Sequence, residues 1–391
     1  MPSNREFFSE KLGALKSAGE FRQAEAWPEG GGVIRMPGGL RLLNFSSNDY
    51  LALANHPVVR QRATVAIERH GCGASASRLM CGTLGLHEEL ERRLASLSGQ
   101  PAALVFSSGF GMNVGLVSAL AEKNDQIYMD RLCHASLTDG ARLSGADIRR
   151  FPHNDADALE RMLASANPDG RKLIITESVF SMDGDIAPLA RLGELAENYN
   201  ALLMVDEAHA IGIWNQGGGL CANMEASLRP AFQLGTLGKA LGSLGGFAAC
   251  LGEAREYLVN RCRSFIFATA LPPPCLGAAL GALEVLAAEP GRGEELLRRA
   301  KAFHSMLSKN GLRLAEFQSQ IIPLHAGSNE AALRLASGLR EAGILAKAIR
   351  PPTVPRGTAR IRFSVTLGHE LPDLEQAAGI IARVAASVGV S

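Results

Sequence analysis

Apolar residues recur at helical spacing in three segments of the first hundred residues. They lie three and four positions apart in residues 1–20, 57–70 and 86–97. This spacing gathers them on one stripe of a helix, so we predict an amphipathic helix in each segment. In the first segment the stripe consists of Phe7, Phe8, Leu12 and Leu15. Short strands are predicted at 33–36 and 40–45, next to the glycine-rich breaks at 30–32 and 37–39.

Beyond residue 100 the pattern changes to short, almost uninterrupted apolar runs separated by helical stretches. The runs cover 102–106, 126–129, 147–151, 172–176, 201–205 and 247–250. Strands that are apolar on both sides belong to sheets covered on both faces, so we predict a mainly parallel sheet in an α/β fold. Ligands of such sheets lie beyond the carboxyl ends of the strands. Asp130, Glu177 and Asp206 each follow one of these runs, at the edge where a ligand would bind.

The order of these elements predicts an α/β protein with a large and a smaller domain. Residues 1–50 form an N-terminal helix with short strands, and residues 51–285 form the large domain around the mainly parallel sheet. The prolines at 272–274 and the helix after them mark the exit from that domain. Residues 286–391 form a smaller C-terminal α/β domain with short strands at 321–325 and 359–365, and the N-terminal segment joins it.

Composition excludes several classes of function. Lysine and arginine number 40 and the acids 39, so no net field draws the chain to nucleic acid or to membrane lipid. The seven cysteines are scattered, with no Cys-x-x-Cys and no zinc-ligand spacing. We therefore expect no metal site and a reducing compartment, the cytoplasm. The N-terminal residues are too polar and too acidic for a signal peptide, and no apolar run approaches the length of a transmembrane helix.

One glycine-rich segment, residues 235–246, contains a single lysine, Lys239, and no other charge. Its five glycines let the backbone turn and approach a ligand closely. A poorly solvated lysine has a lowered pKa, and the neutral amine can attack a carbonyl to form a Schiff base. Pyridoxal phosphate (PLP) enzymes hold their aldehyde cofactor in this way, with a hydroxyl three residues earlier, here Thr236, near the phosphate. The alternative is a surface lysine on a glycine-rich loop.

Other candidate partners of this cofactor follow strands earlier in the chain. Asp206 could pair with the pyridinium nitrogen, which keeps the ring an electron sink, and His209 could reach the ring's phenolic oxygen. His134 could stack on the ring face, although a solitary histidine is more often structural. Asp-Glu-x-His also occurs in helicases, but the chain lacks the Gly-x-x-x-x-Gly-Lys-Ser/Thr phosphate loop that a helicase needs. The strand, glycine turn and helix around 102–111 provide free N–H groups for an anion.

Six motifs occur in an order that is far more specific than any one of them. They cover 44–51, 107–110, 130–136, 177–185, 206–209 and 236–239, and so span nearly the whole chain. On these motifs the chain resembles the α-oxoamine synthases, PLP enzymes that condense an amino acid with an acyl thioester and release carbon dioxide. The resemblance implies a fold-type I PLP-dependent transferase with acyltransferase activity.

The resemblance also implies a role for each matching residue. Lys239 holds PLP as a Schiff base, Asp206 contacts its ring nitrogen, His134 stacks on its face, and His209 lies at its ring oxygen; these four form the expected catalytic set. Further expected cofactor contacts are Ser181 at the oxygen side and, around the phosphate, Gly109, Phe110 and Thr236. Asn48 is expected near the lysine and substrate, and Arg362 is expected to bind the amino acid's carboxylate with its planar fork. Arg360 is the alternative, and we expect it to point to the opposite face of the strand.

Residues 349–355 are most similar to the branch of the family that serves biotin synthesis. That branch condenses L-alanine with pimeloyl-CoA or pimeloyl-acyl carrier protein to 8-amino-7-oxononanoate. The resemblance therefore implies these substrates, with Arg22, His134 and Thr353 among the residues that bind them. The alternatives are a glycine-using relative, 5-aminolevulinate synthase or 2-amino-3-ketobutyrate ligase, and a PLP lyase or aminotransferase. A homodimer with shared active sites is also implied, with the loop 72–78 near its interface.

Overall fold

The computed structural model describes residues 3–390, and the chain divides into two compact units. Unit 1 comprises Met1–Tyr50, Met182–Gly184 and Leu296–Ser391, and unit 2 comprises Leu51–Ser181 and Asp185–Glu295. The N-terminal fifty residues thus share a unit with the C-terminal residues. Unit 2 extends beyond the predicted boundary at 285, to Glu295. The three residues Met182–Gly184, which interrupt it in the sequence, belong to unit 1.

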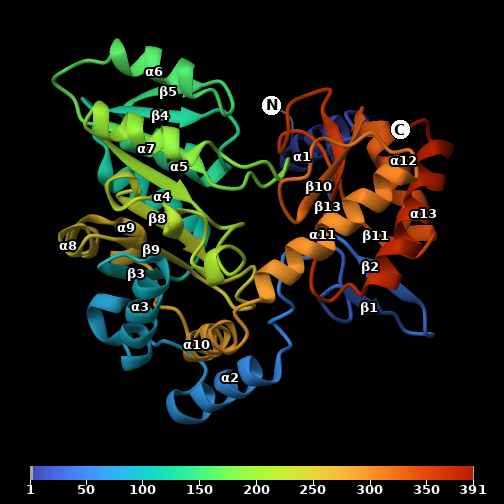
Figure 1. The fold of residues 1–391 in the computed structure, drawn as a ribbon, viewed down its shortest axis with the longest axis horizontal. Coiled ribbons are helices and arrows are strands. Elements are labelled where there is room, and N and C mark those ends of the chain that lie inside the picture. Colours follow the sequence, from blue (N-terminus) through green and yellow to red (C-terminus); the bar gives the residue numbers. More distant parts are fainter. Residues whose placement is uncertain (1–2, 391) are drawn as a thin grey trace. The chain divides into compact units, whose positions relative to one another are not determined.

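Unit 2 is built on a seven-stranded sheet (Figure 1) in the order β3-β9-β8-β7-β6-β4-β5. Its strands are β3 (Ala102–Phe106), β4 (Gln126–Asp130), β5 (Asp147–Phe151), β6 (Lys172–Glu177), β7 (Ala201–Asp206), β8 (Phe232–Thr236) and β9 (Gly246–Cys250). The run from β5 to β8 is parallel, and β9 is antiparallel to both of its neighbours. The predicted α/β fold with a mainly parallel sheet is therefore confirmed.

Strand β8 was not among the predicted strands. Gln233 and Gly235 interrupt its apolar run, which hides it from a pattern of hydrophobic positions. In the sheet Gln233 is buried, and its Nε2 donates to the carbonyl oxygen of Gly218 at 2.8 Å and to the carboxylate of Glu207. A polar side chain is tolerated at this central position because its donors are satisfied.

Both faces of the sheet are covered because alternate residues of each strand point to opposite sides. In β4, Ile127 and Met129 enter one buried cluster together with side chains of α4 (Gly109–Leu120) and α5 (Ala135–Ser144). Tyr128 enters a second cluster with side chains of α6 (Ala156–Ala164) and α7 (Leu189–Asn198). The sheet is thus buried on both sides, and Asp130, Glu177 and Asp206 stand at the ends of its strands.

The remaining helices of unit 2 flank this core. They are α2 (Pro57–His70), α3 (Gly85–Ser98), α8 (Gly252–Arg261), α9 (Arg263–Ile266) and α10 (Pro273–Ala288). A π-helical turn covers Arg78–Gly82, and 3₁₀ turns cover Asn215–Gly217, Cys221–Asn223 and Ala226–Leu228. Helices α2 and α10 pack closely, since a Cβ on Gly277 of α10 would lie 2.4 Å from the carbonyl oxygen of Arg62 in α2.

Unit 1 contains two three-stranded sheets and its own aromatic core. One sheet has the order β1-β2-β11, and the other has the order β10-β13-β12. The strands are β1 (Val33–Arg35), β2 (Arg41–Asn44), β10 (Ile321–Gly327), β11 (Ile344–Leu345), β12 (Ala348–Ile349) and β13 (Ala359–Ser364). Phe45 stacks on Phe303 with ring centroids 5.0 Å apart and meets Phe363 edge-on at 5.7 Å. Phe303 lies on α11 (Arg292–Lys309), and α12 (Asn329–Glu341) and α13 (Leu371–Ser387) complete the unit.

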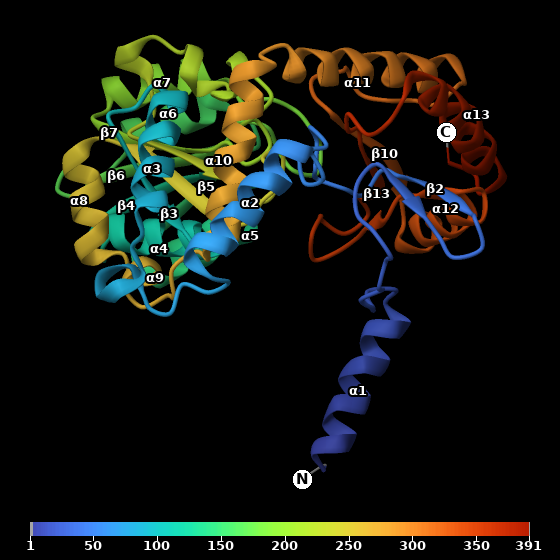
Figure 2. The same ribbon diagram turned by 90° about the horizontal axis from the view of Figure 1, so that it is seen from below.

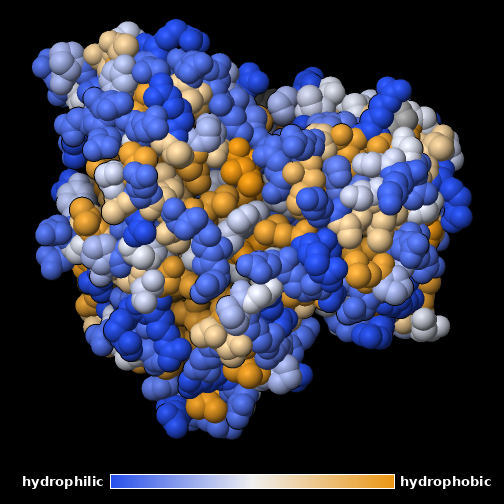
Figure 3. Space-filling view, viewed as in Figure 1, coloured by the Kyte–Doolittle hydropathy of each residue, from blue (hydrophilic) through white to orange (hydrophobic). Residues whose placement is uncertain are grey.

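The first helix, α1 (Asn4–Ser17), begins with a capping box between Ser3 and Glu6 and has no buried residue. Figure 2 shows it projecting away from the sheets of unit 1. The predicted apolar stripe is therefore exposed, with Phe7 at 48% and Phe8 at 62%. None of the helices in residues 3–390 has both the length and the apolar character that a bilayer crossing needs. Polar residues dominate the visible surface, with apolar residues scattered among them (Figure 3).

Candidate active site

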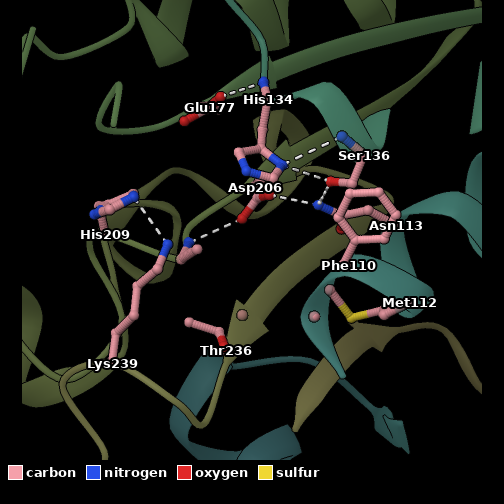
Figure 4. A pocket seen from close by; sticks show the side chains of 13 residues that line it. Phe110, Met112, Asn113, His134, Ser136, Glu177, Asp206, His209, Thr236 and Lys239 are labelled. Carbon is pink, nitrogen blue, oxygen red and sulfur yellow. Dashed lines mark hydrogen bonds between the residues drawn. The ribbon is translucent and has the colours of Figure 1, made fainter. Parts of the chain in front are cut away.

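A pocket of about 180 Å³ lies at the carboxyl edge of the unit 2 sheet (Figure 4). This volume is roughly ten times what a single water molecule needs, so it can hold a small organic molecule. Seven of the residues predicted from the sequence line it: Gly109, Phe110, His134, Asp206, His209, Thr236 and Lys239. They come from the ends of three strands and the start of one helix, and only the fold brings them together.

Lys239 stands in the tight turn that joins β8 to β9. Its Nζ lies 2.8 Å from Nε2 of His209. The turn is closed by a hydrogen bond of 3.0 Å from the N–H of Gly242 to the carbonyl oxygen of Lys239. Gly242 has φ +59°, and a Cβ there would lie 2.4 Å from the backbone nitrogen of Ala54, so only glycine fits. Backbone packing thus fixes where the amine stands.

Asp206 is the last residue of β7 and is 6% exposed. Its Oδ1 accepts the N–H of Ala208 at 2.9 Å, and its Oδ2 accepts Nδ2 of Asn113 at 2.8 Å. Both bonds fix the orientation of the carboxyl group. A carboxyl group at this edge of the pocket is suited to pair with a protonated ring nitrogen.

The start of α4 forms an anion cradle. The Ser108 hydroxyl caps the helix by accepting the N–H of Gly111 at 3.0 Å, whereas the first N–H groups of a helix have no acceptor within it. A Cβ on Gly246 of β9 would lie 2.7 Å from Cα of Gly109, so strand and helix meet at two glycines. Thr236 Oγ1 faces the same place, 3.4 Å from where a Cβ of Gly109 would lie.

A second carboxylate, Glu177 at the end of β6, stands beside Asp206 and is 2% exposed. Its Oε1 accepts the backbone N–H of His134 at 2.6 Å. Burial, and then the negative charge of Asp206, raises the pKa of Glu177 to about 8. Burial also lowers the pKa of His134, which keeps that imidazole neutral at pH 7. A positive charge on Lys239 opposes this increase in the pKa of Glu177.

Asn113 and Ser136 line the pocket and were not among the predicted site residues. Asn113 donates to Asp206 and, at 3.0 Å, to Oγ of Ser136, which in turn lies 2.8 Å from Nδ1 of His134 (Figure 4). A signal existed for Asn113, because α4 is otherwise apolar apart from glycines and Ser118, and Asn113 lies four positions after Gly109. Ser136 follows His134 by two positions and ends the motif 130–136, although no role was predicted for it.

The side chains of the pocket fit PLP. An amine, a carboxyl group and a helix N-terminus with a hydroxyl match the aldehyde, the pyridinium and the phosphate of this cofactor. The two meeting glycines, Gly109 and Gly246, leave the cradle open where any side chain would close it. The pocket therefore has a donor or an acceptor for each polar group of the molecule.

Ser181, predicted at the oxygen side of the ring, is not among the residues that line this pocket. It lies in the loop after β6, at the boundary of unit 2, where its backbone N–H bonds to the carboxylate of Glu177. Its predicted role stays a prediction.

Unit 1 brings together two of the predicted substrate residues, Asn48 and Arg362. Arg362 Nη2 donates to Oδ1 of Asn48 at 3.1 Å and to the hydroxyl of Tyr50 at 2.8 Å. Its Nε is buried and has no acceptor in residues 3–390. Arg360, two residues earlier in β13, has a side chain 5% exposed and pairs with Asp183. The expectation that Arg360 points to the opposite face is wrong, because residues two apart in a regular strand lie on the same face. The two arginines of β13 differ in their partners instead, and of the two it is Arg362 that has a buried donor without an acceptor.

Two further predicted substrate residues, Arg22 and Thr353, donate hydrogen bonds to the same backbone carbonyl oxygen, that of Arg350. Arg22 Nη2 donates to the carbonyl oxygen of Arg350 at 3.1 Å and to that of Pro351 at 2.8 Å. The backbone N–H of Thr353 donates to the same Arg350 oxygen at 3.0 Å. The side chains of Arg22 and Thr353 remain exposed, so both can contact a ligand at the surface of unit 1.

Comparison with known proteins decides the family. The family model described as aminotransferase class I and II matches residues 41–381. The 8-amino-7-oxononanoate synthase of Citrifermentans bemidjiense is 43% identical over 388 residues, 98% of this chain and 99% of the relative. The chain belongs to the α-oxoamine synthase family. A second relative of this α-oxoamine synthase, the 8-amino-7-oxononanoate synthase of Geobacter sulfurreducens, is 43% identical over 97% of this chain and 98% of its own.

Solved structures agree with this placement among the α-oxoamine synthases. A serine palmitoyltransferase from S. paucimobilis, solved with a bound PLP–myriocin aldimine, is 28% identical with a TM-score of 0.92, and each chain covers 100% of the other. An 8-amino-7-oxononanoate synthase from Francisella tularensis is 29% identical with a TM-score of 0.75, over 89% of this chain and 99% of that one. The predicted family, fold class and PLP dependence are confirmed.

Proposed function

We propose that this chain catalyses the decarboxylative condensation of L-alanine with a pimeloyl thioester in biotin synthesis. The products are 8-amino-7-oxononanoate, carbon dioxide and the free thiol of coenzyme A or acyl carrier protein. Two relatives named 8-amino-7-oxononanoate synthase support this at 43% identity over almost the full chain. At the site, the observation that carries the proposal is the meeting of Lys239, Asp206 and the N-terminus of α4 in one pocket.

Each lining residue has a role toward the cofactor in this proposal. Bound PLP supplies an electron sink for negative charge on the α-carbon of alanine. Lys239 Nζ holds the aldehyde carbon until alanine takes its place, and Asp206 keeps the proton on the ring nitrogen. His209 and Ser181 contact the oxygen side of the ring, and His134 covers its face. Gly109 and Phe110 donate their backbone N–H groups to the phosphate, and Thr236 adds its hydroxyl.

The freed amine of Lys239 is the base that removes the α-proton. Its neighbour His209, 2.8 Å away, orients it. The α-carbon of alanine then forms a bond to the thioester carbonyl carbon and the thiol leaves. The alanine carboxylate departs as carbon dioxide, and a proton returns to the same carbon.

Substrate binding is assigned to the residues of unit 1. We infer that Arg362 binds the carboxylate of alanine, because its buried Nε has no acceptor within residues 3–390 and a guanidinium can bind a carboxylate through two donors. Asn48 accepts from the same guanidinium and so fixes its plane. Arg22 and Thr353, which share the carbonyl group of Arg350, are assigned to the pimeloyl chain.

We further propose that the protein is a cytoplasmic homodimer with shared active sites. The family resemblance supports the dimer, and the scattered, odd number of cysteines supports a reducing compartment. Light scattering of the purified protein should give twice the mass of one chain. The mass of a single chain would contradict the dimer and leave the proposed reaction untouched.

Thiol release tests the reaction. Purified protein with PLP is given pimeloyl, acetyl and succinyl thioesters in all combinations with alanine, glycine and serine. Turnover confined to pimeloyl thioester and alanine is expected. Turnover with glycine and a short acyl group would instead assign the chain to a glycine-using relative. Absence of thiol release with every pair would contradict the proposed condensation, and a lyase or aminotransferase assay would follow.

A further inference from the structure

A chain of hydrogen bonds runs from Asp206 through Asn113 and Ser136 to His134 (Figure 4). Asn113 Nδ2 donates to Oδ2 of Asp206 at 2.8 Å and lies 3.0 Å from Oγ of Ser136. His134 Nδ1 lies 2.8 Å from that hydroxyl and 3.3 Å from the backbone nitrogen of Ser136. Asn113 is 4% exposed and Ser136 is fully buried, so bulk water does not compete for these bonds.

The chemistry of the groups fixes the direction of this chain. The amide nitrogen of Asn113 can only donate, so it donates to both of its partners. The backbone N–H of Ser136 can also only donate, so Nδ1 of His134 must be the acceptor and carries no proton. The Ser136 hydroxyl accepts a hydrogen bond from Asn113 and donates one to Nδ1 of His134. In a neutral imidazole the remaining proton is then on Nε2.

The second ring nitrogen of His134 is the one that serves the pocket. His134 lines the pocket, and Figure 4 shows this nitrogen on the side of the ring turned away from Ser136. A ring that carried its proton on Nδ1 would meet the N–H of Ser136 donor to donor. The lowered pKa of His134, which burial causes, further favours the neutral ring.

We propose that Asn113 and Ser136 are positioning residues that hold His134 as the Nε2–H tautomer. The imidazole then offers the pocket a hydrogen-bond donor for an oxygen of the substrate, and it is not a base. The same Asn113 amide holds Oδ2 of Asp206, so one side chain orients two groups of the site. The kinetic part of this inference rests on the proposed function, whereas the protonation state of the ring does not.

Nitrogen NMR of the full chain labelled with ¹⁵N-histidine tests the tautomer directly. The chain has nine histidines, and the His134 signals are assigned by their loss in His134→Asn. In the wild type, with and without PLP, we expect an unprotonated Nδ1 and a protonated Nε2. A proton on Nδ1 would overturn the proposal. In Ser136→Ala only the longer backbone contact of 3.3 Å remains, so we expect a mixture of tautomers, and an unchanged spectrum would show that Ser136 does not fix the ring.

A kinetic cycle tests whether Ser136 acts through His134. With alanine and pimeloyl thioester, Ser136→Ala should lower kcat by about 3- to 10-fold, the worth of one buried hydrogen bond. In a His134→Ala background the same change should not lower kcat further. A double variant whose loss in kcat equals the product of the two single losses would contradict the proposal. Ser144→Ala is the matched control, since Ser144 lies on the same helix and its hydroxyl bonds only to nearby backbone, donating to the carbonyl oxygen of Ala141 and accepting the N–H of Ala146. If Ser136→Ala does not fold, the tautomer in the wild type still decides.

Discussion

Lys239 and Arg362 show how single residues gain their chemistry from their surroundings. Lys239 is placed by a turn in which Gly242 has φ +59° and no room for a side chain, with His209 2.8 Å from its amine. Arg362 is fixed by Asn48 and Tyr50 but retains a buried Nε with no acceptor within residues 3–390. A buried donor of this kind is costly unless a ligand satisfies it.

Lys239→Ala should abolish turnover, because no other amine lines the pocket. Loss of a group that serves as both general base and cofactor holder lowers kcat by at least about 10²–10⁴-fold. The visible absorbance that PLP acquires when a lysine holds it should disappear as well. Lys123→Ala, an exposed lysine of the same unit, is the control and should leave both unchanged. Survival of the absorbance in Lys239→Ala would refute the assignment.

Arg362→Ala should raise the KM for alanine by about 10- to 100-fold, the range for a hydrogen bond to a charged group. The KM for the pimeloyl thioester should change much less, since the effect concerns the amino acid carboxylate. Steady-state kinetics with each substrate varied in turn measures both values. Arg356→Ala is the matched control, because its side chain is 89% exposed. Equal effects on both substrates would argue for a purely structural role of Arg362.

At the scale of elements, a histidine ties two strand-end loops of unit 2 together. His153 Nδ1 lies 3.0 Å from Asp130 at the end of β4, and its Nε2 lies 2.6 Å from Asp185. Asp130 also accepts the N–H of Leu132 in the turn that carries His134. Burial opposes the charge on the imidazole, but the hydrogen bonds with Asp130 and Asp185 outweigh it and raise the pKa of His153 to about 9.

This raised pKa makes the stability contribution of His153 dependent on pH. Because the folded pKa lies above the unfolded value of about 6.5, the contribution is complete below pH 6.5 and is lost as the pH rises through about 9. At pH 6 it is on the order of 3 kcal/mol. The Tm difference between wild type and His153→Gln should therefore be largest near pH 6 and small at pH 10. A difference independent of pH would contradict the charged bridge, and His70→Gln, at an exposed helix end, serves as control.

The junction of β9 with α4 is the second element-scale feature, and it depends on two glycines. A methyl group on Gly246 would stand 2.7 Å from Cα and 3.0 Å from N of Gly109. Gly246→Ala should therefore push the phosphate cradle away from the sheet, weaken PLP binding and cost about 1–3 kcal/mol of stability. Cofactor titration and thermal unfolding measure the two effects. Gly252→Ala, with open space around its Cβ position, should change neither.

At the scale of the whole molecule, the chain passes between its two units more than once. Met182–Gly184 belongs to unit 1, although the residues on both sides belong to unit 2. Within unit 1 this short segment is clamped: Asp183 pairs with the buried Arg360, and a Cβ on Gly184, which has φ +73°, would lie 2.3 Å from the carbonyl oxygen of Ile321. The loop after β6 therefore has one part in each unit.

Asp183→Ala should destabilise unit 1, because it leaves the guanidinium of Arg360 buried without its partner. Removing one partner of a fully buried pair costs about 3–5 kcal/mol, and we expect about 2 kcal/mol here since Asp183 is 28% exposed. Thermal unfolding measures the loss. Asp139→Ala, which breaks an exposed pair with Arg142, should lower the Tm by less than a degree or so. Equal Tm values for the two variants would show that the pair contributes nothing.

Much of the fold could be predicted from the sequence, because the local spacing of apolar residues indicates which segments form helices and which form buried strands. The apolar runs at 126–129, 172–176 and 201–205 became adjacent parallel strands, with Asp130, Glu177 and Asp206 as their last residues. The helix predicted at 57–70 is α2. Strand β8 was not predicted from the sequence. Its residue Gln233 can be buried only because it bonds to Glu207 and Gly218, which belong to other segments of the chain.

The sequence by itself determined the family, the cofactor and the candidate residues, because the motifs that carry them are short and their order is specific. Only the tertiary structure decided which partners those residues have. The bonds from Asn113 to Asp206 and Ser136 and the pairing of Arg360 with Asp183 join segments 23 to 177 positions apart. Periodicity reports which side of an element is buried, but not which polar group of another element it meets there, and that choice fixes orientation and protonation.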